Sequence, residues 1–188
     1  SAVQGMRSIT YTFPGETLMC NGCHEQRVGS QPPKVQPQAM RRKPSIIKPE
    51  GDGTNPFNYP RLVQPVLDRN CAGCHDKARA EGKKAPDLRP GNWKENKDLF
   101  YTSFCNLKPY VFFYNDAAFT ASYTVPGEFG ARASKLYKML KAGHHDVKLS
   151  DDDFRRLVVW LDSNCIFFGH ELDIERQAAG EVVLPPLY

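Results

Sequence analysis

The chain has 188 residues, which suits one domain or two small halves that share a core, and we expect one compact unit. Hydrophobic residues make up 40% of the sequence, charged residues make up 24%, and no stretch approaches the roughly 18 uninterrupted apolar residues of a membrane span. This composition indicates a soluble globular protein. The net charge of +4 is spread along the sequence, which argues against a nucleic-acid-binding face.

The segment from Pro32 to Pro60 contains seven prolines and is expected to be extended and irregular. It divides the chain into a first lobe of about residues 1–58 and a second lobe of about residues 59–188. The basic run Arg41-Arg42-Lys43 within it is either a solvated loop or a docking patch for an acidic partner. The sequence shows no signal peptide, and we expect a mature form or a part excised from a larger protein.

A first helix is predicted from about Pro60 to the cysteine at position 71. Proline suits an opening turn, whereas Pro65 inside the segment predicts a short or kinked helix. Its apolar face consists of Leu62, Val63, Val66 and Leu67.

A second helix is predicted from Ala131 to Ala142, where Leu136, Met139 and Leu140 recur at helical spacing. Gly143 supplies the position that ends it. The pair His144 and His145 follows this stop, so both are expected at a fixed place in the fold.

The third helix is the best specified of the three. Ser150 is predicted as its N-cap, and Asp151 to Asp153 occupy the first turn, where the helix dipole favours acidic side chains. Leu149 and Phe154 have the spacing of a hydrophobic staple. The buried stripe is predicted to be Phe154, Leu157, Val158 and Leu161. An aromatic run between residues 100 and 114 is expected to form short strands or loops.

Four of the six cysteines fall into two CxxCH motifs, Cys20-Asn21-Gly22-Cys23-His24 and Cys71-Ala72-Gly73-Cys74-His75. This motif places two thiols where they can form thioethers to one haem, and the adjacent histidine can bind the iron. The sequence therefore predicts two covalently bound haem c groups, attached at Cys20, Cys23, Cys71 and Cys74, with His24 and His75 as axial ligands.

Other uses of these cysteines fit less well. A thioredoxin-like CxxC requires a βαβ context, structural zinc requires closer cysteine pairs, and an iron–sulfur cluster requires a further cysteine cluster. The two remaining cysteines, Cys105 and Cys165, are either a disulfide or two buried thiols.

The group on the opposite face of each iron decides the chemistry, because two strong ligands give an electron-transferring iron and an open face permits substrate binding. Few residues can serve as this second ligand of the iron. Met19 adjoins Cys20, and Met139 suits a helix core. The Gly143-His144-His145 corner is the best distal site.

The sequence resembles the haem-bearing C-terminal region of hydrazine synthase alpha-subunit-like proteins, which are multidomain secreted proteins of planctomycetes and their relatives. The resemblance covers nearly the whole chain. The matching segments are Pro14-Gly15-Glu16-Thr17 before the first CxxCH, Arg41-Arg42-Lys43-Pro44-Ser45, residues 59–68 before the second CxxCH, residues 124–131, residues 143–150 and Trp160-Leu161-Asp162.

The resemblance implies that the second haem has two histidine ligands and that His144, rather than His145, is the partner of His75. At the first haem, the named enzyme binds iron through a tyrosine four residues beyond the CxxCH histidine, and that histidine binds zinc. This sequence has Val28 there, which argues against hydrazine formation. We expect His24 on the iron, with the distal face open or filled by Met40 or His170.

The sequence thus predicts a mainly α, cytochrome c-like dihaem domain with long irregular Pro-rich segments and little β structure. Its expected function is electron transfer between a partner domain or protein and an external acceptor. Alternatives are a haem enzyme whose open first haem acts on a small nitrogen or peroxide substrate, with Glu25 or Asp151 to Asp153 as acid–base groups, and a scaffold whose core the haems build. Thioether attachment of haem occurs outside the bacterial cytoplasm, so a periplasmic or secreted protein is expected.

Overall fold

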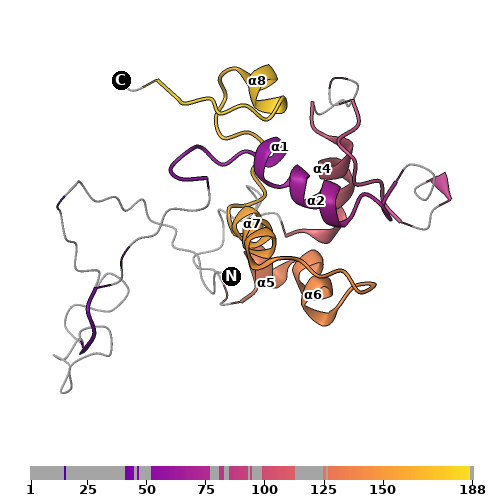
Figure 1. The fold of residues 1–188 in the computed structure, drawn as a ribbon, viewed down its shortest axis with the longest axis horizontal. Helices are drawn as coiled ribbons and strands as arrows, with labels where there is room; N and C mark the ends of the chain where they lie inside the picture. Colours follow the sequence, from indigo (N-terminus) through magenta and orange to yellow (C-terminus); the bar gives the residue numbers. More distant parts are fainter. Residues whose placement is uncertain are drawn as a thin grey trace. The chain divides into compact units, whose positions relative to one another are not determined.

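A computed structural model of the chain describes residues 52–76, 81–82, 85–92, 94, 99–112, 125 and 127–186, together with 15, 41–44 and 46. The chain separates into two units, one of Arg7–Glu50 and one that contains Gly51–Tyr188. The described residues are mainly helical with almost no strand (Figure 1), which confirms the predicted mainly α class. None of the described helices is long and apolar enough to cross a membrane.

The second unit carries the helices labelled in Figure 1. Seven of the described segments are α-helical, and one is a short 3-10 helix. They are α1 (Tyr59–Leu62), α2 (Gln64–Asn70), α4 (Thr102–Leu107), η2 (Lys108–Tyr110), α5 (Gly130–Ala133), α6 (Lys135–Ala142), α7 (Asp151–Asp162) and α8 (Ile174–Ala178).

The predicted first helix is present as two short helices, α1 and α2. Asn58 caps α1, and its side chain accepts a hydrogen bond from the Arg61 N–H at 3.0 Å. The helix breaks at Val63, because Pro65 has no N–H to donate to the carbonyl of Arg61. The predicted kink is therefore confirmed, and α2 ends at the residue before Cys71.

The predicted second helix is interrupted, so the expectation of one continuous helix from Ala131 to Ala142 was wrong. Ser134 has an extended ψ of 131° between α5 and α6. Its hydroxyl accepts a hydrogen bond from the Phe112 N–H at 3.0 Å and donates one to the carbonyl of Gly130 at 2.7 Å. The predicted stop is confirmed, because Gly143 ends α6 with a φ of +94° that favours glycine.

Helix α7 begins and ends close to the predicted positions. The Ser150 hydroxyl accepts a hydrogen bond from the Asp153 N–H at 3.1 Å, as expected for an N-cap. Leu157 and Leu161 are buried, and Phe154 and Val158 are half-buried. The stripe also contains Trp160, which is fully buried.

The aromatic run was expected to form strands or loops, and this expectation was wrong for residues 102–110, which form α4 and η2. Phe104 in α4 is buried against Tyr59 and Phe167, with ring centroids 5.2 and 4.9 Å apart respectively. Tertiary packing of aromatic rings thus overrides the weak preference of these residues for strands.

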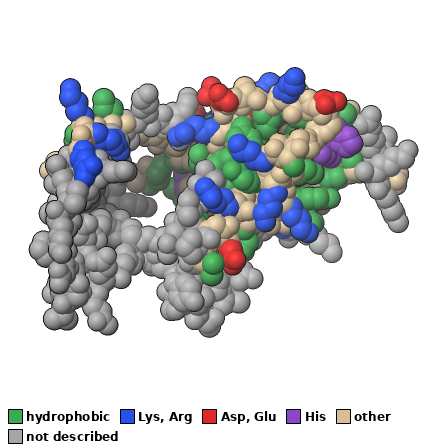
Figure 2. Space-filling model, turned by 90° about the horizontal axis from the view of Figure 1, so that it is seen from below, with side chains coloured by type: hydrophobic (Ala, Val, Ile, Leu, Met, Phe, Trp, Pro, Cys, Tyr) green, Lys and Arg blue, Asp and Glu red, His purple; other side chains and the backbone are tan. Residues whose placement is uncertain are grey.

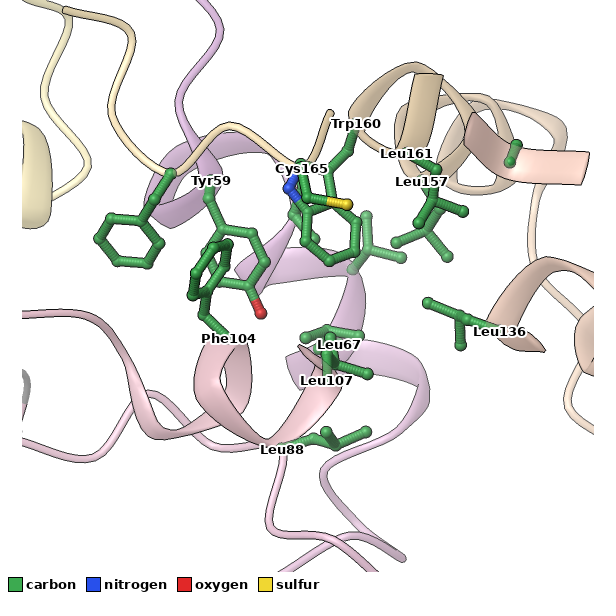
Figure 3. Close-up of a cluster of buried hydrophobic side chains, with 14 residues drawn as sticks. Tyr59, Leu67, Leu88, Phe104, Leu107, Leu136, Leu157, Trp160, Leu161 and Cys165 are labelled. Carbon is green, nitrogen blue, oxygen red and sulfur yellow. The ribbon is translucent and has the colours of Figure 1, made fainter. Parts of the chain in front are cut away.

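The core lies between α1, α2, α4 and α7 (Figure 3). The fully buried Tyr59 ring lies at its centre and also packs against Trp160 with 5.2 Å between centroids. Figure 3 shows Leu67, Leu107 and Leu88 gathered at one end of this cluster and Leu157, Leu161 and Leu136 at another. Met139 and Leu140 of α6 pack against the same cluster. The core therefore connects the segment before Cys71 with the helices on both sides of His144.

Candidate functional site

The first CxxCH motif and its surroundings lie outside the described residues. This holds for Cys20, Cys23 and His24, and also for Val28 and the distal candidate Met40. The acid–base candidate Glu25 lies there as well. The expectations for the first haem therefore stay predictions.

The second CxxCH motif forms a tight turn at the end of α2. The N–H groups of Cys74 and His75 both donate to the carbonyl of Cys71, at 3.0 and 2.9 Å. Cys71 is half-buried and Cys74 is exposed, and both are thiols. Burial, and to a smaller extent the neighbouring Cys74, raises the pKa of Cys71 to about 11. The turn therefore places the sulfurs of Cys71 and Cys74 close in sequence to His75.

His75 is oriented by a backbone carbonyl. Its Nδ1 lies 3.0 Å from the carbonyl oxygen of Pro86, and a carbonyl can only accept, so the proton sits on Nδ1. In the neutral imidazole, the other ring nitrogen, Nε2, then has a lone pair that can bind a metal ion. A backbone carbonyl on the outer nitrogen is the usual arrangement around a metal-binding histidine.

The imidazole rings of His144 and His75 lie close together. The two ring centroids are 5.9 Å apart, and the ring planes differ by 37°. Two metal–nitrogen bonds of about 2 Å on opposite sides of one ion would separate the nitrogens by about 4 Å and the ring centroids by about 6 Å. The observed centroid spacing of 5.9 Å is close to this value.

A turn after α6 fixes the position of His144. The Val147 N–H donates to the carbonyl of His144 at 2.9 Å, and the two residues between them, His145 and Asp146, have positive φ values of 46° and 61°. His145 is exposed and packs edge-on against His144, with 4.7 Å between ring centroids. The structure thus brings His144, the histidine that the resemblance implies, to the ring of His75.

The surroundings of His144 favour its neutral form. Partial burial lowers the pKa of His144, and the neighbouring rings of His145 and His75 lower it further because two adjacent imidazolium charges would repel each other. A neutral imidazole is the form that binds metal ions. The described surroundings therefore favour the ligand form of His144 at neutral pH.

His170, the alternative distal ligand of the first haem, already uses both ring nitrogens. Its Nδ1 accepts from the Leu172 N–H at 3.1 Å, so the proton sits on Nε2, which donates to the carbonyl of Val183 at 2.8 Å. Iron binding by His170 would break at least one of these bonds. The described geometry therefore counts against His170.

Cys105 and Cys165 are two thiols and not a disulfide in this structure. Cys165 is buried in the core, and burial raises the pKa of its thiol to about 12. Its sulfur lies 4.0 Å from the carbonyl oxygen of Phe112, which is a weak hydrogen bond at most. Of the two alternatives that the sequence leaves open, the structure has two thiols, but only Cys165 is buried, whereas Cys105 is half-buried.

The acid–base candidates on α7 have structural roles. Asp151 and Asp152 are exposed in the first turn. Asp153 is buried and accepts hydrogen bonds from Arg69 at 2.6 Å and Asn70 at 3.2 Å, at the end of α2. Asp153 thus ties the start of α7 to the residues that precede Cys71.

We predict that Asp153→Asn destabilises the protein by about 1–2 kcal/mol at pH 7, because it removes a charged hydrogen-bond acceptor. Burial alone would raise the pKa of Asp153, but the hydrogen bonds from Arg69 and Asn70 outweigh it and hold the pKa below its ordinary value of 3.8. A depressed pKa contributes stability above the unfolded-state pKa, and this contribution disappears as the pH falls through the folded-state pKa.

Urea denaturation of wild type and variant at several pH values measures this effect. The difference in the free energy of unfolding should be constant above about pH 5 and shrink steadily below the ordinary pKa of Asp. Asp152→Asn is the matched control, since Asp152 is exposed in the same helical turn. An equal loss for both variants would contradict the role of the contact with α2.

The sequence gives no signal for the Pro86 carbonyl, since a backbone acceptor has no side chain to recognise. Pro86 and Pro90 indicate only an extended segment. Within the described residues, no group of three or more His, Cys, Asp or Glu side chains is placed to hold a metal ion. Comparison of the chain with protein-family models, curated proteins and solved structures finds no match.

Proposed function

We propose that the protein is a dihaem c-type cytochrome module that transfers electrons between a partner domain or protein and an external acceptor. The observation that carries the proposal is the pair of neighbouring imidazoles, His75 and His144, whose ring centroids lie 5.9 Å apart, with His75 in the motif that also contains the thiols Cys71 and Cys74. His75 and His144 would hold the iron of a haem attached here, and that haem would supply a one-electron carrier.

The chain's own residues would keep this haem closed to substrates. His75 is held by the carbonyl of Pro86, and His144 is held by the turn that Gly143 opens. Two fixed imidazoles leave no iron position for water or substrate, and ligation by two histidines favours a low reduction potential. These features support electron transfer over catalysis at this site.

The partner is proposed to be an acidic surface. Helix α6, which ends next to His144, carries Lys135, Lys138 and Lys141 on its exposed side and has no acidic residue. Figure 2 shows Lys and Arg side chains spread among hydrophobic ones on one face of the protein. Such a face attracts an acidic protein by long-range electrostatics, which the exposed acidic residues Asp146, Asp151 and Asp152 moderate.

We also propose, from the sequence resemblance, that the chain corresponds to the haem-bearing region of a hydrazine synthase alpha-subunit-like protein and acts in the periplasm or after secretion. Val28 in place of the iron-binding tyrosine argues against hydrazine formation. The enzyme alternative therefore requires an open first haem, which would appear as high-spin iron that binds carbon monoxide.

The haem content is tested by intact mass after expression in a periplasm with thioether-attachment machinery. Wild type should carry two haems, Cys71→Ala with Cys74→Ala should lose one, and Cys20→Ala with Cys23→Ala should lose the other. Cys105→Ala and Cys165→Ala are controls that should keep both, since neither cysteine belongs to a CxxCH motif. A wild-type mass equal to that of the polypeptide alone would refute the proposal.

A further inference from the structure

A segment of five residues beside His75 is held by every one of its carbonyl groups. The carbonyl of Pro86 accepts from His75 at 3.0 Å, and that of Asp87 accepts from the side chain of Asn106 at 2.9 Å. Leu88 accepts from the side chain of Gln64 at 3.1 Å. The carbonyls of Arg89 and Pro90 accept from the N–H groups of Ser103 and Thr102, at 3.1 and 2.8 Å. We call residues 86–90 the carbonyl segment.

The carbonyl segment also donates a hydrogen bond to the second CxxCH motif. The N–H of Leu88 donates to the carbonyl of His75 at 2.9 Å, so Leu88 and Pro86 bind the same histidine through its backbone and its ring. The Leu88 side chain is 5% exposed and lies with Leu67 and Leu107 in the core (Figure 3). The position of Leu88 therefore determines where the Pro86 carbonyl lies, which accepts the hydrogen bond from the His75 ring.

Gln64 holds Leu88 from inside the core. It is 3% exposed, and its amide nitrogen donates to the Leu88 carbonyl and to the carboxylate of Asp68, the latter at 2.7 Å. Both acceptors fix the orientation of the amide, so its oxygen must accept from the Ser103 hydroxyl, 2.5 Å away. Ser103 accepts in turn from the hydroxyl of the buried Tyr59 at 3.0 Å.

In this series of hydrogen bonds each side chain donates to the next residue, from Tyr59 to Ser103, from Ser103 to Gln64 and from Gln64 to Leu88. Ser103 and Tyr59 are both 0% exposed, so water does not compete for any of their bonds. A buried and fully satisfied network is rigid, because any rearrangement leaves a buried polar group without a partner. Helices α1, α2 and α4 are therefore joined to Leu88, two residues after the Pro86 carbonyl that orients His75.

We propose that Gln64 is a positioning residue for the axial ligand His75, acting through Leu88 on the hydrogen bond between His75 Nδ1 and the Pro86 carbonyl. The proposal rests on the proposed function, since it concerns the haem at Cys71 to His75. A strong Nδ1–H bond makes the imidazole a better donor to the metal and stabilises the more positive ferric ion. Gln64 thus keeps the reduction potential of this haem low.

The test is Gln64→Met, which keeps the length of the side chain and removes its hydrogen bonds. We expect the midpoint potential of the haem at Cys71 to His75 to shift to a more positive value and its ferric electron paramagnetic resonance signal to change. The signals of the other haem should stay as in wild type. Asn106→Ala removes the side-chain hydrogen bond to the Asp87 carbonyl alone and should give a smaller shift of the midpoint potential in the same direction. It is the variant to measure if Gln64→Met does not fold.

Asn58→Ala is the matched control. Asn58 is also buried, caps α1 and donates to the carbonyl of Gln177 at 3.1 Å, but it has no bond to the carbonyl segment. It should lower the urea midpoint without moving either potential. The proposal is overturned if Gln64→Met or Asn106→Ala lowers stability and leaves the potential and the resonance signal unchanged. A wild type without haem in its intact mass would overturn the proposed function and this proposal together.

Discussion

His144→Ala should convert one of the two proposed haems from low-spin to high-spin iron and open it to carbon monoxide. His144 is the histidine whose ring faces His75 at 5.9 Å, and alanine has no atom that can reach the metal. Loss of a strong axial ligand leaves an iron with one imidazole and an open position. Low-temperature electron paramagnetic resonance of the ferric protein and carbon monoxide titration of the ferrous protein measure the change.

His145→Ala is the control for this prediction, because His145 is the exposed neighbour of His144 in the same turn. It should leave the spin state of both haems unchanged. A high-spin signal after His145→Ala, with none after His144→Ala, would reverse the assignment of the ligand. If neither variant changes the spin state, the iron is not held between His75 and this turn.

The wild-type spectrum separates the two functions at the same time. Two low-spin haems support an electron-transfer module, since both irons are then closed to small ligands. One high-spin haem in wild type, still present after Cys71→Ala with Cys74→Ala, would locate an open iron at Cys20 to His24 and favour the enzyme alternative.

Helix α7 could be predicted from the sequence because its signals are local. Ser150 caps the N–H of a residue three positions away, and the buried stripe follows the helical period. The break at Ser134 could not be predicted in this way. It depends on a hydrogen bond to the backbone of Phe112, 22 residues earlier in the chain. Local pattern specifies a helix, whereas its interruption is set by a distant partner.

The candidate site shows the same division. The CxxCH turn and the corner after Gly143 are visible as short motifs, so Cys71, Cys74, His75 and the pair His144 and His145 could be proposed from the sequence, and the family resemblance implied His144 of the two. No local pattern reports how these residues approach one another in space, which group accepts from His75, or the series of hydrogen bonds from Tyr59 to Leu88. These contacts involve residues 11 to 69 positions from His75 or His144. The aromatic residues of α4 fit a strand as well as a helix until their packing is known.

Trp160→Ala should remove about 3–5 kcal/mol from the free energy of unfolding, which is a large fraction of the roughly 5–15 kcal/mol that stabilises a typical domain. The Trp160 ring is 0% exposed and packs against Tyr59 and Phe104, with centroids 5.2 and 6.2 Å away. Its indole N–H donates to the carbonyl of Ile166 at 3.1 Å, so the substitution creates a cavity and also removes this part-buried hydrogen bond.

Urea denaturation of the haem-containing protein, followed by far-ultraviolet circular dichroism, measures the loss. Val182→Ala is the control, because Val182 is 42% exposed and its truncation should change stability by no more than about 0.5 kcal/mol. Trp160→Phe keeps most of the packing and should fall between the two. Because Trp160 touches the Tyr59 ring that begins the chain of bonds to Leu88, Trp160→Ala should also broaden the resonance signal of the haem at Cys71 to His75. A stability loss no larger than that of Val182→Ala would mean that the aromatic cluster around Tyr59 is not the core that holds this haem site.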